Sequence, residues 1–587
     1  MKLKSLRVKN FRNFENVTID LTNQNVVFGM NDVGKTNFLF AIRFLLDRDI
    51  RKNGFIESDY LKNDTNEIIE ITLGIDLSDR ESSEDSQHIL AKVGKARSSN
   101  DLDNFFFQVK GVYDEGEEVG IPKIYWGSAK DNLEEIPQNG IYSDLDNLFK
   151  IVYIDPTIDL EKTFSKNRKK LFDQNKLETS DIVISNDIKK LGLDMNRKIS
   201  SMGVIQSFQE TITEEYQKLK KEKINIEMKS EITINGYFGN LVPYIKREND
   251  DNVYPTSGDG RKKILAYSLI NHLMKAQEGN KIIIYLVEEP ENSLHRSMQI
   301  ALSQQLFNSE VYKYFFLSTH SSELLYEMDN ASLIRIYSEK RINCSSYIYN
   351  VDDEYKNVKK ELNRALSTAL FSEKVLLIEG PSEKVLFEKV LEKVFPRYEL
   401  EGGYILEVNG IKFKPYVDVL KGLNITSIVK TDNDLKAKRG HPTKFDLIGI
   451  NRCLNLIHTK GEQTKEHVEI DYYYENEKGN RVFKERVKQQ MIKEKKREQY
   501  DVFEKSIKQF EENNIFLSRI DLEHDLYEVI EARMKEILGT KPIDYLQNHK
   551  LINMIELASK LTIEDCEAII EHPLFQSLSK LVPNEID

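Results

Sequence analysis

Two aspartates, Asp432 and Asp434, stand two residues apart at the end of the apolar stretch ITSIVKTDND. In an extended segment, residues two apart point to the same side, so both carboxylates face one region of space. Like charges this close repel each other unless a cation or water lies between them. The pair therefore predicts a divalent metal site. The alternative is a solvated turn in which aspartates cap a helix.

A second group of carboxylates follows the apolar run KVLLI, where Glu379 is followed by Gly380 and, after two more residues, by Glu383. In open α/β sheets, ligands bind at the carboxyl ends of the strands, so both groups can converge there. Oxygen-only ligands favour Mg²⁺ or Mn²⁺ over zinc. A carboxylate set of this kind suits two-metal hydrolysis of a phosphodiester bond.

The stretch GMNDVGKT matches the phosphate-binding pattern G-x-x-x-x-G-K-[ST]. Its glycines let backbone N–H groups close around phosphates, Lys35 neutralises the β and γ phosphates, and Thr36 holds Mg²⁺. The stretch follows an apolar strand and opens an amphipathic helix, which is the context that the pattern requires. The alternative is a glycine turn that caps a helix. The residues expected to contact ATP are Gly29, Asn31, Gly34, Lys35 and Thr36.

Further elements of a nucleotide site come later in the chain. The apolar run KIIIYLV ends at Glu288 and Glu289, of which one carboxylate would join the Mg²⁺ shell and Glu289 would orient or deprotonate water. Ser257 and Gly258 lie in a loop before an expected helix, and His320 ends the run YFFLSTH. A histidine at a strand end is more often a packed residue than a catalytic one, so its role depends on the other elements.

The composition limits the classes of protein. With 587 residues, 40% hydrophobic and 31% charged, the chain is expected to be globular and to form several domains. Its three cysteines have no CxxC spacing, which fits a reducing compartment and argues against structural zinc. There is no apolar run of about 18 residues and no signal-peptide pattern, so we expect a cytoplasmic protein without membrane contact.

The formal net charge of −12 excludes nucleic-acid binding by the whole surface. Binding must therefore use metal ions or local basic patches. One candidate patch follows the aspartate pair and consists of Lys436, Lys438 and Arg439. The other lies on the charged helix expected over 483–510, from Lys484 to Arg497, although such helices are usually solvated.

The order of the first four motifs resembles the ATP-binding-cassette (ABC) ATPases of the SMC and RecF type. This resemblance implies a dimeric ATPase head in which the Ser-Gly signature of one subunit closes over the nucleotide of the other. Glu288 stands where these families usually carry aspartate, which implies slow hydrolysis.

The later pattern, EGxxE after one strand and DxD after another, resembles the Toprim domain. An ABC-type head followed by Toprim in one chain resembles the OLD family of nucleases, including the nuclease subunits of Gabija anti-phage defence systems. The implied fold class is α/β. Residues 1–345 form the ABC-type ATPase domain, with a helical insertion at about 155–235 expected to mediate dimerisation. Residues 346–587 form the Toprim nuclease domain with a C-terminal helical part.

The resemblance also implies the residues of the nuclease site. The implied metal ligands are Glu379, Glu383, Asp432, Asp434, Asp521 and, second to Asp521, Glu523. Lys550 corresponds to the residue that stabilises the transition-state phosphate, with Lys541 as a nearby competitor.

The function implied by the resemblance is metal-dependent endonucleolytic hydrolysis of duplex DNA, restrained by ATP binding, in anti-phage defence. Implied partners are double-stranded DNA, a UvrD-like helicase subunit (GajB) and further copies of the chain, as a dimer or tetramer. Two alternatives stay open at this point: an SMC/RecF-like DNA-binding scaffold with an inactive Toprim domain, and a topoisomerase-like enzyme with a tyrosine nucleophile.

Overall fold

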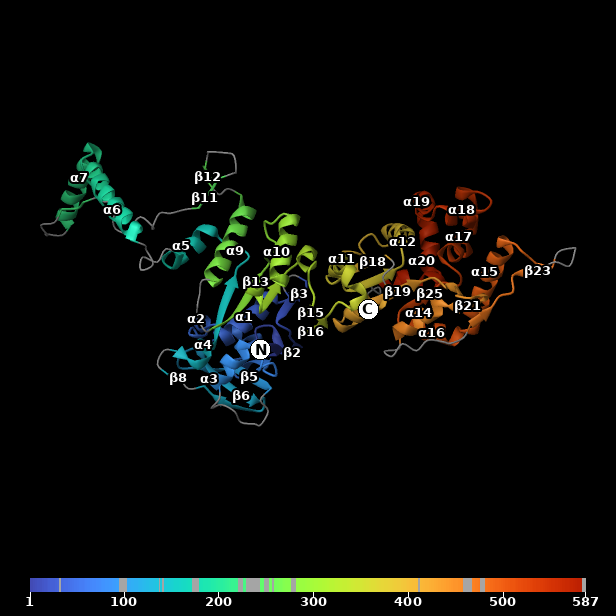
Figure 1. Cartoon of the computed structure of the whole chain (residues 1–587), viewed down its shortest axis with the longest axis horizontal. Helices are drawn as coiled ribbons and strands as arrows, with labels where there is room; N and C mark the ends of the chain where they lie inside the picture. The colour runs from blue at the N-terminus through green and yellow to red at the C-terminus, as the bar shows by residue number, and fades with distance from the viewer. Residues whose placement is uncertain are drawn as a thin grey trace. The chain divides into compact units, whose positions relative to one another are not determined.

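The computed structural model describes residues 1–30, 33–93, 103–136, 138–139, 142–171, 179–219, 225–227, 243–246, 253–255, 258–275, 281–409, 412–457, 467–475 and 481–582. The chain forms two compact units. Unit 1 comprises residues 1–152, 282–286 and 300–587, and unit 2 comprises residues 153–281 and 287–299. Figure 1 colours the elements along the chain. No helix in these described ranges is long and apolar enough to cross a membrane.

An antiparallel sheet forms the first part of unit 1. Its strand order is β2 (Phe14–Asp20), β1 (Lys2–Phe11), β4 (Ile69–Asp76), β5 (Asn104–Asp114), β6 (Val119–Ala129) and β7 (Asn132–Glu135). Helix α3 (Glu84–Val93) follows β4, and the short helices α2 (Arg48–Arg51) and α4 (Asp144–Leu148) belong to the same unit. Buried and exposed residues alternate from Val17 to Asp20 of β2, as expected for a sheet with one face in the core.

A second six-stranded sheet carries the phosphate-binding loop. Its order is β10 (Phe149–Ile154), β13 (Ile282–Glu288), β14 (Phe315–Ser318), β3 (Gln24–Phe28), β15 (Ala331–Ser338) and β16 (Ile342–Tyr349). β3 runs parallel to β14 and β15, and all four residues of β14 are buried. Continuous apolar runs of this kind are typical of parallel strands that are covered on both faces. Six residues separate the end of β3 from the start of helix α1 (Lys35–Leu46).

A parallel four-stranded sheet forms the centre of the C-terminal half. Its order is β18 (Gly403–Glu407), β17 (Lys374–Ile378), β19 (Thr426–Thr431) and β25 (Ile515–Leu517). Helix α12 (Pro381–Val394) contributes Leu386 and Phe387 to a core that also contains Leu376 of β17. Helices α11 (Lys359–Ala369), α13 (Lys414–Gly422) and α14 (Ile448–Ile457) belong to the same half. The carboxyl ends of β17, β19 and β25 therefore share one edge.

Helices and a small sheet complete the C-terminal half. The sheet consists of β20 (Leu435–Lys438), β21 (His441–Leu447) and β22 (His467–Glu469). The charged helix expected over 483–510 is two helices, α15 (Glu485–Val502) and α16 (Glu504–Glu512), separated at Phe503. The final helices are α17 (Leu522–Leu538), α18 (Pro542–Asn548), α19 (Lys550–Lys560), α20 (Ile563–Glu571) and α21 (Gln576–Leu581).

Unit 2 is largely helical in its described part. It contains α5 (Leu160–Leu171), α6 (Thr179–Ser200), α7 (Gly203–Leu219) and α9 (Asp259–Lys275), and α10 (Arg296–Asn308) begins in it. The helices α5 to α7 fall within the segment expected to be a helical insertion. The domain boundary between residues 345 and 346 stays a prediction.

Candidate functional site

Carboxylates from three neighbouring parallel strands meet at one edge of the C-terminal sheet. Glu379 directly follows β17, Asp432 directly follows β19, and Asp521 lies four residues beyond β25. The backbone N–H of Asp432 donates to Glu379 Oε1 at 3.1 Å, and Thr431 Oγ1 donates to the same oxygen at 2.5 Å. The two carboxylate groups that were expected to converge therefore lie side by side.

Glu383 lies beneath this edge, at the start of α12. Its Oε2 accepts the N–H of Glu379 at 2.6 Å and the N–H of Gly380 at 3.0 Å, so it caps the helix. Its Oε1 is buried and has no hydrogen-bond partner among the described residues. Burial raises the pKa of Glu383 to about 7, and the neighbouring Glu379 carboxylate adds to this shift.

Asp432 is the centre of the carboxylate group. Burial raises its pKa well above the usual value, and the charges of Glu383, Glu379, Asp521 and Asp434 raise it further. One of its oxygens, Oδ1, accepts the N–H of Leu522 at 3.1 Å. A carboxyl that is both desolvated and surrounded by four others ionises readily only when a cation is bound beside it.

Asp521 caps α17 and is held by two side chains. Its Oδ1 accepts the backbone N–H of His524 at 3.0 Å and also contacts Nδ1 of the His524 ring, and its Oδ2 accepts from Gln547 Nε2 at 3.0 Å. Burial opposes its ionisation, but the hydrogen bonds and charge of His524, together with Lys496, outweigh that effect and lower its pKa. Asp521 is therefore an ionised member of the group at neutral pH.

Glu523 and Lys550 form an ion pair beside Asp521. Lys550 Nζ lies 3.1 Å from Glu523 Oε1, while Glu523 Oε2 is buried without a hydrogen-bond partner in the described part of the chain. Burial raises the pKa of Glu523, and Asp521 adds to the rise. Burial alone would lower the pKa of Lys550, but the charge of Glu523 raises it. Lys541, the alternative lysine, is an exposed residue that precedes α18.

Two cations that no sequence motif predicts at this position, Arg452 and Lys496, enter the carboxylate group. Arg452 of α14 contacts Glu379 and Thr431 through Nη1, and its Nη2 lies 3.6 Å from Asp434 Oδ2. Lys496 of α15 lies 3.4 Å from Asp434 Oδ1. Lys496 was expected only as part of a basic helix, and no motif marks Arg452.

The loop that carries Asp432 and Asp434 is fixed by its neighbours. Asn433 Nδ2 donates to the carbonyl of Lys496 at 2.9 Å and to that of Arg519 at 3.2 Å. Gly449 at the start of α14 packs against the loop so closely that a Cβ there would lie 2.5 Å from the Asp432 carbonyl oxygen. The N–H of Gly449 also donates to the Asp434 carbonyl at 3.1 Å. The solvated-turn alternative does not account for this burial and packing.

The donor set fits a divalent cation. Among the described residues, no three His, Cys, Asp or Glu side chains are already gathered around one point as metal ligands are. However, the donors are carboxylate oxygens, which Mg²⁺ and Mn²⁺ prefer. A bound cation would give a partner to the buried oxygens that have none among the described residues, Glu383 Oε1 and Glu523 Oε2. It would also favour ionisation of Asp432, whose pKa is raised.

The described residues of the GMNDVGKT motif lie at the end of β3 and the start of α1. Lys35 is buried, and its Nζ donates to the carbonyls of Gly29 at 3.1 Å and Met30 at 2.9 Å. Gly34 has φ +106°, and a Cβ there would lie 2.1 Å from Asn13 Nδ2, so only glycine fits. Thr36 is the second residue of α1. Asn31 lies outside the described residues.

The carboxylates after β13 belong to unit 2. Glu288 is buried and accepts a hydrogen bond from the Tyr153 hydroxyl, whereas Glu289 has a positive φ of 40° and accepts from Asn292 Nδ2 at 3.2 Å. A positive φ in a residue other than glycine is a strained conformation of the kind found at functional sites.

The remaining predicted nucleotide contacts lie in two places. Gly258 has φ +91° and immediately precedes α9, while Ser257 lies outside the described residues. His320, in unit 1, stacks on Phe371 with ring centroids 6.4 Å apart.

The basic patch that follows the aspartate pair is exposed to solvent. Lys436, Lys438 and Arg439 are exposed on and beyond β20, and Lys438 Nζ lies 2.9 Å from His467 Nε2. This patch is therefore accessible to a polyanion, and it closely follows Asp432 and Asp434 in the sequence. On α15, the Lys496 side chain is 12% exposed and its Nζ lies 3.4 Å from Asp434 Oδ1.

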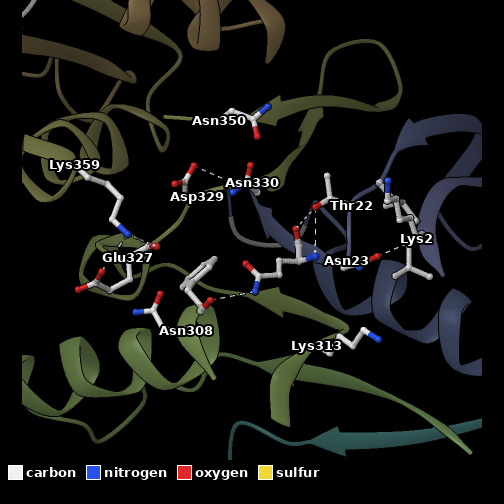
Figure 2. Close-up of a pocket in the computed structure, with 14 residues that line it drawn as sticks. Lys2, Thr22, Asn23, Asn308, Lys313, Glu327, Asp329, Asn330, Asn350 and Lys359 are labelled. Atoms are coloured by element: carbon white, nitrogen blue, oxygen red, sulfur yellow. Dashed lines mark hydrogen bonds and ion pairs between the residues drawn. The ribbon is translucent and has the colours of Figure 1, made fainter. Parts of the chain in front are cut away.

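Figure 2 shows a polar cavity of about 660 Å³ that is distinct from both sites. Its lining includes Asn23 and Gln24, at the amino end of β3. The phosphate-binding loop follows the opposite end of that strand, roughly 17 Å away at about 3.3 Å per residue. An ion pair between Lys359 and Glu327, 3.3 Å apart, occupies one wall. The cavity is therefore not the nucleotide site.

Comparisons with known proteins agree with this organisation. Residues 1–325 match the AAA ATPase domain family, and residues 370–434 match the TOPRIM domain of overcoming-lysogenization-defect-like proteins. The fold and the site thus define an ATPase joined to an OLD-like TOPRIM domain, and the fold class expected from the sequence is confirmed.

Three relatives place the chain more narrowly. The chain is 51% identical over 586 residues to Endonuclease GajA of Bacillus cereus (strain VD045), with 100% of both chains covered. It belongs to the GajA endonuclease family. It is also 21% identical over 434 residues to the Old nuclease of Escherichia phage P2, covering 67% of this chain and 70% of that one. A 46-residue stretch, 8% of this chain and 13% of the relative, is 52% identical to RecF of Lactococcus lactis subsp. lactis (strain IL1403).

Proposed function

We propose that this chain is a divalent-metal-dependent endonuclease that hydrolyses phosphodiester bonds of duplex DNA in anti-phage defence. The observation that carries the proposal is the convergence of Glu379, Asp432 and Asp521 at the carboxyl edge of three adjacent parallel strands. Membership of the GajA endonuclease family supports the reaction class.

The proposed roles follow from the positions of the side chains. Two Mg²⁺ or Mn²⁺ ions would activate water and stabilise the leaving oxygen. Glu379, Asp432, Asp434 and Asp521 would hold the ions, with Glu383 and Glu523 as further carboxylates. Lys550 pairs with Glu523, and its ammonium would stabilise the charge that develops on the phosphate.

The proposed role of the ATPase domain is control of the nuclease. The buried Lys35, the left-handed Gly34 and Thr36 support ATP binding at the loop after β3. By family resemblance alone, Asn31, Glu288, Glu289 and His320 are further nucleotide contacts, and Ser257 and Gly258 contact the nucleotide of a second subunit. By family resemblance, bound ATP restrains DNA cleavage.

The first test is plasmid cleavage by the purified chain and by Asp432→Ala, with Mg²⁺ or Mn²⁺, with and without millimolar ATP. Nicked or linear product from the wild type but not from the variant supports the nuclease site. Product with free 5′-phosphate ends supports hydrolysis, whereas a covalent protein–DNA adduct supports the topoisomerase alternative. Equal cleavage with and without ATP contradicts the proposed control.

We also propose that unit 2 mediates self-association into a dimer or tetramer. Its described helices expose apolar side chains that a single globular chain would bury. On and between α6 and α7 these are Ile182, Val183, Ile184, Leu191, Leu193, Met202, Val204, Phe208 and Ile212. Mass photometry of Leu191→Asp/Val204→Asp is expected to show smaller particles, while the unit 1 control Ile68→Asp keeps the wild-type mass.

The proposed protein partner is a UvrD-like helicase subunit (GajB), which rests on the family resemblance alone. Co-purification of the two tagged proteins tests it. Separate elution at micromolar concentration contradicts it.

A further inference from the structure

Arg452 stands where a cation is needed between two carboxylates from different strands. Its guanidinium contacts Glu379 and Thr431 through one nitrogen, and its other terminal nitrogen lies 3.6 Å from Asp434. Glu379 follows β17 and Asp434 follows β19, so the guanidinium bridges two strand ends. Glu379 and Asp434 are both among the carboxylates that would hold a divalent cation.

The side chain reaches this position from a helix that is fixed to the same loop. Gly449, three residues before Arg452, packs on the backbone of Asp432 and Asn433 and donates its N–H to the Asp434 carbonyl. The guanidinium also lies 6.0 Å from the ring centroid of Phe413. The base of Arg452 is therefore held in place, while its side chain remains 26% exposed.

A guanidinium is charged at any pH a protein tolerates, and its planar fork matches both carboxylate and phosphate oxygens. Beside the carboxylates it lowers their mutual repulsion. A divalent cation on the same oxygens would repel it, and a phosphate of DNA bound at this edge is an anion that the guanidinium could contact instead. The same side chain can therefore serve two anions in turn.

We propose that Arg452 is an exchangeable counter-ion of the nuclease site. It pairs with Glu379 and Asp434 when metal is absent, and it contacts a DNA phosphate once metal occupies those carboxylates. This inference rests on the proposed nuclease function and adds a phosphate-binding residue to it.

The test uses the full chain with Arg452→Met, which keeps much of the side-chain volume but removes the charge. Removal of a like charge a few ångströms away is expected to strengthen Mn²⁺ binding without DNA by about threefold to tenfold. Loss of a phosphate donor is expected to slow cleavage by about a hundredfold and to lower the salt slope of DNA binding by about 1. Arg452→Lys is expected to be intermediate, and the exposed Arg397→Met is the matched control.

Weaker Mn²⁺ binding by Arg452→Met would overturn the inference, because it would make Arg452 a support for the carboxylates. Unchanged Mn²⁺ affinity with an unchanged salt slope would overturn it as well. The metal titration contains no DNA, so it judges Arg452 independently of cleavage. If the Asp432→Ala variant cleaved DNA at the wild-type rate, the proposed nuclease function itself would be overturned.

A second set of contacts joins the phosphate-binding strand to the strands that carry the carboxylates. Phe28, the last residue of β3, lies edge-on to Phe371 with ring centroids 6.0 Å apart. His320 stacks on the same Phe371 ring, with centroids 6.4 Å apart. Phe371 lies three residues before β17, which ends next to Glu379. One aromatic ring thus contacts both a strand end of the nucleotide site and its predicted histidine.

Arg335 makes a parallel connection. It pairs in register with Phe28 across β15 and β3, and its side chain is 4% exposed. It donates to Glu373 at 2.5 Å, directly before β17, and to the carbonyl of Asn424 at 2.5 Å, two residues before β19. Arg335 of β15 is therefore hydrogen-bonded to residues just before β17 and β19, the two strands that end beside Glu379 and Asp432.

We infer that Phe371 and Arg335 transmit the state of the phosphate-binding loop to the nuclease carboxylates. The inference rests on the proposed control of cleavage by ATP and names the residues that carry it. Discrete packing contacts of this kind can couple two sites when ligand binding shifts one of them.

The test compares the ratio of cleavage rates without and with ATP, alongside binding of a fluorescent ATP analogue. Phe371→Ala and Arg335→Lys are expected to bind the analogue within about threefold of wild type, whereas their rate ratio falls towards 1. Arg341→Lys, an exposed arginine of the β15–β16 turn, is the control. A variant ratio equal to that of wild type overturns the inference. If the wild-type cleavage rate is the same with and without ATP, the proposed ATP control is overturned, and the inference about Phe371 and Arg335 is overturned with it.

Discussion

Lys430 and Asp525 form a buried ion pair, with Nζ 3.0 Å from the carboxylate and both side chains 1% exposed. Lys430 of β19 also donates to the carbonyl of Leu574, and Asp525 of α17 accepts the N–H of Arg519. The pair therefore links β19, the strand that directly precedes Asp432, to the helix that Asp521 caps.

Removal of one partner of this pair is expected to destabilise the chain. Lys430→Met leaves the Asp525 carboxylate buried without its counter-charge, and we expect a loss of about 3–5 kcal/mol. Thermal unfolding followed by calorimetry measures this loss, and Lys430→Met/Asp525→Leu should recover much of it. The exposed pair Lys508 and Glu504 supplies the control, since Lys508→Ala should leave the transition in place. Equal shifts for Lys430→Met and Lys508→Ala would contradict the assignment.

The stability of the metal-free chain is expected to depend on the protonation of Glu383. Its pKa is raised to about 7, above the value of about 4.3 for an unfolded glutamate. Because the folded pKa is the higher one, the contribution of Glu383 is complete below about pH 4.3 and is lost as the pH rises through 7.

In EDTA, the stability of wild type relative to Glu383→Gln should therefore fall between about pH 5 and pH 7, on the order of 1 kcal/mol per unit, and level off at higher pH. Addition of Mg²⁺ at pH 8 should restore it. Melting temperatures of both proteins across this range are the measurement. Parallel curves for the two proteins would show that Glu383 does not titrate in this window.

Gly449 is expected to tolerate no side chain. In Gly449→Ala the new Cβ would meet the Asp432 carbonyl oxygen at 2.5 Å and Asn433 Cα at 2.8 Å, so the aspartate loop must move. We expect a destabilisation of about 1–3 kcal/mol and a cleavage rate at least about tenfold lower. ATP binding should be unaffected. Gly203→Ala, where nothing lies within 4 Å of the new Cβ, is the control. Full activity of Gly449→Ala would refute the packing argument.

Lys35 is expected to be required for nucleotide binding and dispensable for DNA cleavage itself. Lys35→Ala removes the ammonium that neutralises the phosphates, and binding of a fluorescent ATP analogue should weaken by at least about tenfold. Cleavage by this variant should no longer respond to ATP. The exposed Lys52→Ala is the control. Retained ATP response in Lys35→Ala would place the nucleotide elsewhere.

Much of the organisation could be predicted because its signals are local in the sequence. The glycines, Lys35 and Thr36 recur at fixed spacing because a phosphate must be enclosed by one loop. Glu379 and Asp432 directly follow apolar runs that form β17 and β19, and parallel strands present their carboxyl ends at one edge. The order of an ATPase and a Toprim domain therefore followed from the sequence alone. The domain boundaries and the site residues stay predictions.

Only the tertiary structure revealed the cations of the site. Arg452 lies 73 residues from Glu379 in the chain, and Lys496 lies 62 residues from Asp434. Neither belongs to a short motif, because their roles depend on how α14 and α15 pack against the sheet. The same holds for Lys430 and Asp525, whose types predict surface residues until the fold buries both. Local spacing determines which elements form and which carboxylates end them, whereas long-range packing decides which charges those carboxylates meet.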